Sequence, residues 1–206
     1  MKKNMLTLAF ALSTLLFSTQ LSAQESKLSL GFRANSSLSN YSLSGQAKSL
    51  KSKMGIGGSA GGFIKYDLTP NFAVQSGIDV YFHSSKLEST ASTSSRKLNS
   101  FGVEIPLYGI IQGELGSGKA FIGAGPYAGY GISAKLGGVS LFKENGTPDM
   151  PALNRFDYGV GGIIGYEFDQ HWQLKANYQF GLADLDKAKG AGMKSRVASV
   201  GIAYKF

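Results

Sequence analysis

Ten charged side chains that alternate with apolar ones are the first candidates for chemistry. They comprise five bases and five acids: Arg33, Lys65, Lys135, Lys175 and Lys205, with Asp67, Asp79, Glu104, Glu114 and Glu167. A carboxylate pair such as Asp79 and Glu104 would suit acid and base catalysis, and a row of ionisable groups would suit a proton or small-ion path. We favour a balanced network of ion pairs in the interior of the fold, because buried charges without partners are costly.

A second candidate is His83, which precedes Ser84 and Ser85. Some eight-stranded barrels are lipid A hydrolases that place His and Ser near the outer rim. A nucleophile needs a base within hydrogen-bond reach and usually a third group to orient that base. A single His-Ser-Ser run is a weak signal where loop serines are plentiful. We therefore interpret His83 as a rim residue and His171, beside Trp172, as an interface residue. The absence of cysteine excludes thiol nucleophiles and thiolate metal sites. We expect no catalytic residue, no cofactor and no metal.

Strands with one apolar face must position these residues. From Trp172 to Leu182 every even-numbered residue is apolar, and every odd-numbered residue is polar or glycine. This two-residue period is typical of a strand whose two faces meet different surroundings. The pattern predicts eight strands, over residues 28–34, 54–68, 72–82, 101–115, 120–136, 158–168, 172–182 and 198–206. No charged residue falls on the apolar face of any of them.

Two kinds of eight-stranded barrel fit this pattern, and the polar face distinguishes them. A soluble lipocalin-like barrel turns its apolar face inward, whereas a transmembrane barrel turns it toward lipid. The polar face here combines many glycines with tyrosines and charged residues, as the interior of a narrow barrel requires. The apolar face ends in aromatic residues, which we expect to form girdles at the two membrane interfaces. One girdle would contain Tyr66, Phe72, Phe168, Trp172, Tyr204 and Phe206, and the other Phe82, Phe101, Tyr158 and Phe180.

The connections between the predicted strands alternate in length. Residues 36–53, 83–100, 137–155 and 183–196 are predicted to be long loops, and residues 69–71, 116–119 and 169–171 short turns. Outer-membrane barrels have short periplasmic turns and longer outer loops. The serine-rich segments 36–45 and 84–95 are predicted to be mobile. Pro106 and Pro126 fall inside predicted strands, where each should mark a bulge or a break in pairing.

Residues 1–23 are predicted to be a secretory signal peptide. Lys2 and Lys3 precede an apolar run from Met5 to Phe17, which is too short to span a membrane as a helix. This order of basic and apolar residues, followed by the small residue Ala23, predicts export with cleavage between Ala23 and Gln24. Residues 24–206 would then form the outer-membrane domain.

The predicted long loops contain many of the basic residues that give the chain its positive net charge. The chain of 206 residues has a formal net charge of +8, although charged residues make up only 17% of it. The basic loop residues are Lys48, Lys51, Lys53, Lys86, Arg96, Lys97, Lys187, Lys189, Lys194 and Arg196. We expect them to pair with phosphates of lipopolysaccharide, with ordinary solvated charge as the alternative. Nucleic acid is not expected as a partner, because the charge is spread over separate loops.

Several segments resemble one family. The signal ending LSA-Q, VEIPLYGII (103–111), FIGAGPYAGYGI (121–132), DYGVGGIIGYEF (157–168), ANYQFGL (176–182) and GIAYKF (201–206) are similar to the PorT-like outer-membrane β-barrel domain of Bacteroidota. The resemblance covers nearly all of residues 24–206. It implies an outer-membrane barrel, and the family's name comes from a member linked to protein secretion. The terminal Phe206 is similar to the C-terminal aromatic residue that the barrel-assembly machinery reads.

The sequence therefore predicts an all-β, eight-stranded antiparallel up-and-down transmembrane barrel that is a monomer with a plugged polar interior. A structural or interaction role at the cell envelope is the function we favour, with a secretion system or another surface molecule as partner. A lipid A-modifying hydrolase and a narrow ion or small-solute channel are the alternatives.

Overall fold

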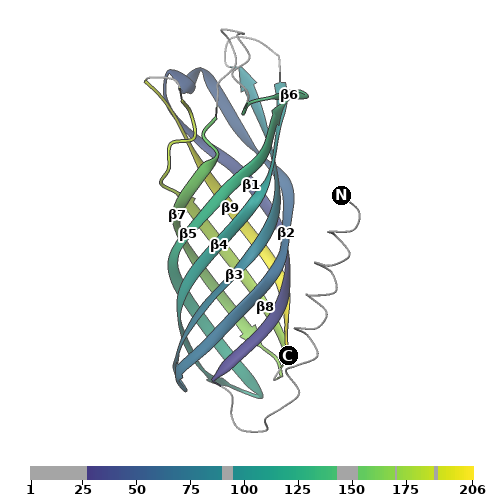
Figure 1. Cartoon of the computed structure of the whole chain (residues 1–206), viewed down its shortest axis with the longest axis vertical. Helices are drawn as coiled ribbons and strands as arrows, with labels where there is room; N and C mark the ends of the chain where they lie inside the picture. The colour runs from purple at the N-terminus through teal and green to yellow at the C-terminus, as the bar shows by residue number, and fades with distance from the viewer. Residues whose placement is uncertain (1–26, 90–94, 143–152, 170, 188–189) are drawn as a thin grey trace, which may run out of the picture.

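Eight long antiparallel strands close into one ring in the computed structural model, which describes residues 27–89, 95–142, 153–169, 171–187 and 190–206 (Figure 1). The strands are β1 (Leu28–Gly45), β2 (Leu50–Thr69), β3 (Phe72–Ser89), β4 (Ser95–Leu115), β5 (Gly118–Leu136), β7 (Phe156–Glu167), β8 (Trp172–Gly181) and β9 (Ala191–Lys205). Each strand pairs with its neighbours along the chain, and β1 pairs with β9 to complete the ring. The predicted eight-stranded up-and-down barrel is confirmed.

The two ends of the barrel differ. The short connections β2–β3, β4–β5 and β7–β8 lie at the same end as the C-terminus, and we call this the turn end (Figure 1). The opposite end carries the 3-10 helix η2 (Gln46–Ser49) and the two-residue strand β6 (Val139–Ser140), which pairs with β5. We call it the loop end.

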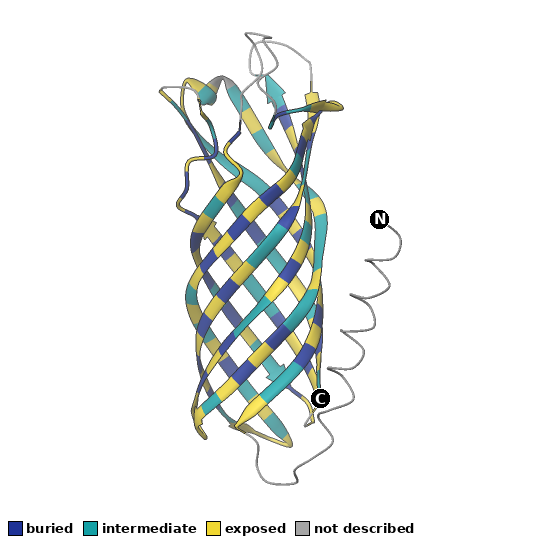
Figure 2. Cartoon of the chain, in the orientation of Figure 1, coloured by how far each residue is buried: buried dark blue, intermediate teal, exposed yellow. Residues whose placement is uncertain are grey.

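Burial alternates along every strand, as Figure 2 shows. Around the middle of the barrel the apolar side chains point outward, and Ile78, Ile164 and Val200 remain about three-fifths exposed. Polar and small residues occupy much of the interior, together with a buried apolar cluster of Ala73, Tyr108, Ile110, Phe121 and Ile163. Closure of the ring pairs the backbone groups of every strand with a neighbour, which lipid demands of any spanning sheet.

Small residues beside large ones fill the narrow interior. A Cβ atom on Gly31 would lie 2.6 Å from the Phe63 ring, and one on Gly102 would lie 2.6 Å from the Tyr81 hydroxyl. These glycines therefore leave the space that the facing aromatic rings occupy. This is the packing expected of an eight-stranded barrel, whose interior is only wide enough for side chains.

Most strands are longer than predicted, chiefly β1, β2, β3, β4 and β9, which corrects the loop boundaries. Residues 36–45 belong to β1, and residues 84–89 and 95–100 belong to β3 and β4, so these serine-rich segments are not loops. The period-2 pattern continues through them with its polarity reversed. Leu87 and Leu98 are buried there, whereas Lys86 and Lys97 are exposed. The outward apolar face ends at Phe82 and Phe101, although β3 and β4 continue beyond them.

The prolines interrupt pairing without shifting it. β4 and β5 pair as far as Pro106 with Tyr127 and resume at Gly109 with Ala124 in the same register. The Ser76 hydroxyl donates a hydrogen bond to the Pro106 carbonyl at 2.9 Å, on the side facing β3. The predicted break in pairing is present, and the alternative of a bulge at the prolines is not.

A register irregularity lies instead near the loop end of β5. Phe101 pairs with Ser133 but Gly102 pairs with Gly131, so β5 has one extra residue at this point. An extra residue reverses the faces of the positions that follow it. Ala134 is consequently buried inside the barrel, and Lys135 is exposed on its outer surface. The prediction that Lys135 belongs to the interior network is wrong for this reason.

Candidate functional site: the lumen and its two ends

Four of the predicted interior charges meet near the turn end. Lys65 Nζ lies 3.5 Å from Asp67 Oδ1 and 3.9 Å from Glu167 Oε2. The Lys205 ammonium donates to the other oxygen of Glu167. Strands β2, β7 and β9 contribute these side chains, so the ion pairs cross the lumen and link separate parts of the wall.

Two glutamines complete the hydrogen bonding of these carboxylates. Gln112 Nε2 donates to Asp67 Oδ1 at 2.8 Å, and Gln173 Nε2 donates to Glu167 Oε2 at 2.9 Å. Below this layer the lumen opens at the turn end into a mouth of about 1270 Å³. Glu114 lines the mouth and is exposed, because it follows the last buried position of β4. It is therefore a rim residue outside the interior network.

The middle of the lumen holds a second, separate set of predicted charges. Arg33 Nε donates to Asp79 Oδ1 at 2.7 Å, and both side chains are buried. The Glu104 carboxylate accepts a hydrogen bond from Gln179. Lys175 is also buried, but among the described residues no carboxylate lies within 4 Å of it. Eight of the ten predicted charges thus lie at two levels of the lumen, and Lys135 and Glu114 lie outside both. Ion pairs join the four charges near the turn end and, in the middle, Arg33 with Asp79.

A third polar group was missed at the sequence level. Asp157, at the start of β7, accepts a hydrogen bond from Ser195, and the Tyr127 hydroxyl lies 3.1 Å from Ser195 Oγ. The two-residue alternation already places Asp157 on the inward face of this strand. The predicted strand began one residue later, at Tyr158.

The rest of the central lumen has little free volume. Two cavities of about 50 Å³ and about 20 Å³ lie between these polar groups. Such volumes hold a few water molecules at most. Buried oxygen atoms with no hydrogen-bond partner among the described residues, including those of Tyr108 and Ser37, line the smaller cavity.

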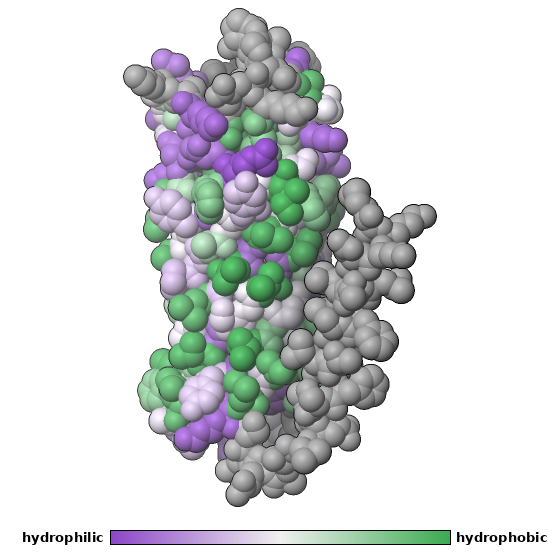
Figure 3. Space-filling view, viewed as in Figure 1, coloured by the Kyte–Doolittle hydropathy of each residue, from purple (hydrophilic) through white to green (hydrophobic). Residues whose placement is uncertain are grey.

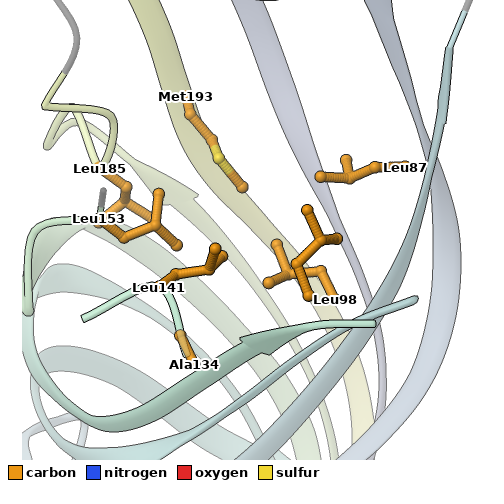
Figure 4. Packing of buried hydrophobic residues seen from close by; sticks show 8 residues of the cluster. Leu87, Leu98, Ala134, Leu141, Leu153, Leu185 and Met193 are labelled. Atoms are coloured by element: carbon orange, nitrogen blue, oxygen red, sulfur yellow. The ribbon is translucent and has the colours of Figure 1, made fainter. Parts of the chain in front are cut away.

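An apolar plug closes the lumen toward the loop end (Figure 4). We use this name for the buried cluster of Leu87, Leu98, Ala134, Leu136, Leu141, Leu153, Leu185 and Met193. Its members come from β3, β4, β5 and β9 and from the segments between β6 and β7 and between β8 and β9, and they point toward one another across the lumen. The loop segments are held by backbone hydrogen bonds, from Leu141 N to Ala134 O at 2.9 Å and from Leu185 N to Met193 O at 2.8 Å.

His83 lies inside the barrel. Its ring stacks on Tyr81 at 4.6 Å between centroids, and it lines the lumen cavities. Ser84 and Ser85, the predicted nucleophile candidates, are buried. The geometry therefore holds this histidine away from the lipid-facing wall, where a lipid substrate would approach.

Exposed aromatic side chains encircle the wall at two levels. Toward the turn end these are Phe32, Tyr66, Phe72, Phe168, Trp172, Tyr204 and Phe206, and toward the loop end Phe82, Phe101, Tyr130, Phe156, Tyr158 and Phe180. Tyr178 is also exposed and lies on β8 between Trp172 and Phe180. Several contact each other edge to face, such as Trp172 with Tyr204 at 5.0 Å. The last residue is fixed by the wall, since Phe206 N donates to Leu30 O at 2.9 Å.

Asp169 is the acidic residue that organises the β7–β8 turn. Its Oδ1 accepts hydrogen bonds from the backbone N–H groups of Trp172 at 2.8 Å and His171 at 2.7 Å. These bonds favour the ionised carboxylate and lower the pKa of Asp169 below its ordinary value of 3.8.

Several predicted features stay outside what the structure tests. The signal peptide, with Ala23 and Gln24 at its cleavage site, and Lys189 lie outside the described residues. Within the described ranges, no group of three or more His, Cys, Asp or Glu side chains could hold a metal ion. No helix in the described part of the chain is long and apolar enough to cross a membrane.

Comparison with known proteins agrees with this architecture. The family model of the outer membrane protein beta-barrel domain matches residues 20–187. The outer membrane protein OprG from Pseudomonas aeruginosa is similar in structure, with a TM-score of 0.57 and 13% identity over 88% of this chain and 96% of that chain. Neisserial surface protein A has a TM-score of 0.47 and 18% identity over 86% and 97% of the two chains. The curated proteins provide no match.

Proposed function

The chain belongs to the outer membrane protein beta-barrel domain family, and from that premise we propose that it is a closed structural barrel whose loop end makes contacts at the cell surface. The family places the chain in the outer membrane. The aromatic side chains at the two levels of the wall would lie at the membrane interfaces, with the loop end outside and the turn end in the periplasm.

The apolar plug is the observation that carries this proposal. A conducting pore needs a continuous wet path, whereas Leu98, Leu136 and Leu185 pack against one another above the polar lumen. Below them, the Arg33–Asp79 pair and the ion pairs near the turn end occupy the remaining cross-section. An interior filled in this way favours a scaffold over a channel.

Planar-bilayer recording of the folded, heat-modifiable protein tests this proposal. We expect no conductance steps, with a general porin inserted in the same bilayers as the positive control. Reproducible steps from the protein itself would favour the narrow channel instead.

Two finer roles complete the proposal. The PorT-like segments support an accessory role in protein secretion, which would be seen as loss of secreted proteins when the chain is removed and their return when it is restored. Phe206 would serve as the signal for the barrel-assembly machinery. Phe206→Ala should then slow membrane insertion in cells while leaving refolding in detergent unchanged.

A further inference from the structure

Four lysines form a row across the outer surface at the loop end. Lys86 on β3 stands directly opposite Lys53 on β2 and directly opposite Lys97 on β4. Lys135 on β5 pairs with Asn99, which lies two positions along β4 from Lys97 and on the same face. All four lysines are exposed, and we call them the lysine row.

The row has too little negative charge of its own. Like charges directly opposite each other on neighbouring strands repel and destabilise the sheet. Lys53 Nζ is 2.9 Å from Glu88 Oε2, but within the described residues no carboxylate lies within 4 Å of Lys86, Lys97 or Lys135. One carboxylate therefore faces four ammonium groups that the barrel wall holds side by side.

The height of the row matches the polar surface of a membrane. Phe82 and Phe101 pair with each other and are exposed, and Lys86 and Lys97 each lie four residues beyond them toward the loop end. At about 3.3 Å per residue and a strand tilt of about 40°, the lysines stand about 10 Å beyond the aromatic level. Figure 3 shows hydrophilic residues gathered over the loop end and hydrophobic residues over the middle of the barrel.

We propose that the lysine row is a binding site for the phosphate groups of lipopolysaccharide in the outer leaflet. The inference rests on the proposed function, because it needs the loop end to face outward. Paired strands fix the spacing of the ammonium groups, and phosphates at this level would relieve their mutual repulsion. Lysines on a flexible loop would lose conformational entropy on binding, whereas the backbone positions of these lysines are already fixed by strand pairing.

The test compares two quadruple variants of the full chain in mild detergent, titrated with fluorescent lipopolysaccharide. One variant replaces Lys53, Lys86, Lys97 and Lys135 with Gln. The control replaces Lys48, Lys119, Lys187 and Lys194 with Gln, which are exposed lysines outside the row, so both variants lose the same charge. We expect the row variant to bind about tenfold or more weakly, with reduced salt dependence, and the control to bind within about twofold of the unmodified protein.

Three results would overturn the lysine row as the binding site. They are equal weakening in both variants, unchanged affinity in the row variant, and equal binding of dephosphorylated lipopolysaccharide by the unmodified protein. Each sample is also checked for its heat-dependent shift on a gel and for protease access to the loop end on intact cells. If the barrel is folded and its loop end is accessible on cells, but binding does not depend on phosphate, only the lysine row as a binding site is refuted. If the loop end is not accessible on cells, the proposed function is refuted as well.

Discussion

The barrel wall has two sections with opposite side-chain patterns. In the section between the two aromatic levels, apolar residues such as Val80 and Val103 point outward and charged residues such as Asp79 and Glu104 point inward. Beyond Phe82 and Phe101, in what we call the outer section, leucines point inward and lysines outward. The same strands β3 and β4 run through both sections. The surroundings of the wall, lipid or water, therefore decide which face is apolar, while the backbone period stays at two.

The two sections are also held together differently. The interior of the lipid-facing section combines one apolar cluster with ion pairs and hydrogen bonds, which require their partners in place. The interior of the outer section resembles the core of a soluble protein, in which packing of the plug excludes water. Substitutions that act on one kind of interior and spare the other should separate the two sections experimentally.

The largest effect is expected at the central ion pair. In the unmodified protein Arg33 Nε lies 2.7 Å from Asp79 Oδ1. Asp79→Leu removes this carboxylate and leaves the guanidinium group buried without a partner for its charge. We expect a loss of about 3–5 kcal/mol in the free energy of unfolding, measured by urea titration in detergent with the gel shift as readout. The double variant Arg33→Met with Asp79→Leu is the control and should recover most of the loss. A double variant as unstable as the single one would show that packing, and not the unpaired charge, sets the effect.

The plug should respond to loss of volume. Leu98→Ala removes a side chain that is only 1% exposed, and a cavity remains where it packed. We expect a cost of about 2–5 kcal/mol, measured in the same urea titration, together with faster proteolysis at the loop end. Leu107→Ala is the matched control, because Leu107 lies on the same strand but faces outward. Detergent can close around that site without a cavity, so its cost should be smaller. Equal costs would mean that the two faces of β4 do not differ as proposed.

The barrel itself could be predicted from the sequence because its signal is local. Alternation from Trp172 to Leu182 is readable in one segment, and β8 spans Trp172–Gly181 in the structure. The outer section is harder to predict, because no single apolar face runs the whole length of a strand. After Phe82 the outward face becomes polar, which predicts a loop, although Leu87 continues the alternation with the opposite phase.

The interior site was predictable only in part. Charges such as Arg33 and Asp79 could be assigned to the lumen from phase alone, but their pairing depends on register and on the stagger of the closed ring. The extra residue in β5 leaves no marker in the sequence, so the outward position of Lys135 could not be foreseen. The plug joins residues that are far apart in the sequence, such as Leu87 and Met193, and no sequence period encodes this clustering.

A charge on the outer surface should distinguish lipid from water directly. Val200 faces outward on β9 opposite Ala176, midway along β8 between Trp172 and Phe180. Val200→Lys should cost about 2–4 kcal/mol in a bilayer, because the ammonium group would enter hydrocarbon. Val139→Lys, in β6 at the loop end, is the matched control and should change the unfolding free energy by at most about 0.5 kcal/mol. Unfolding in liposomes gives both values. A large cost at position 139 would place the loop end within the membrane and remove the distinction between the sections.

The smallest effect is expected in the β7–β8 turn, which belongs to neither section. Hydrogen bonds from Trp172 N–H and His171 N–H lower the pKa of Asp169, so the carboxylate stabilises the turn at pH values above 3.8 and this stabilisation is lost as the pH falls through the lower, folded pKa. Hydrogen exchange at the Trp172 amide should therefore show protection that declines below about pH 4. Asp169→Asn keeps an acceptor oxygen that does not titrate, so protection should become independent of pH over this range. Asp169→Ala removes the acceptor and should lower protection at neutral pH as well. If Asn and Ala behave alike, the charge rather than the hydrogen bond organises this turn.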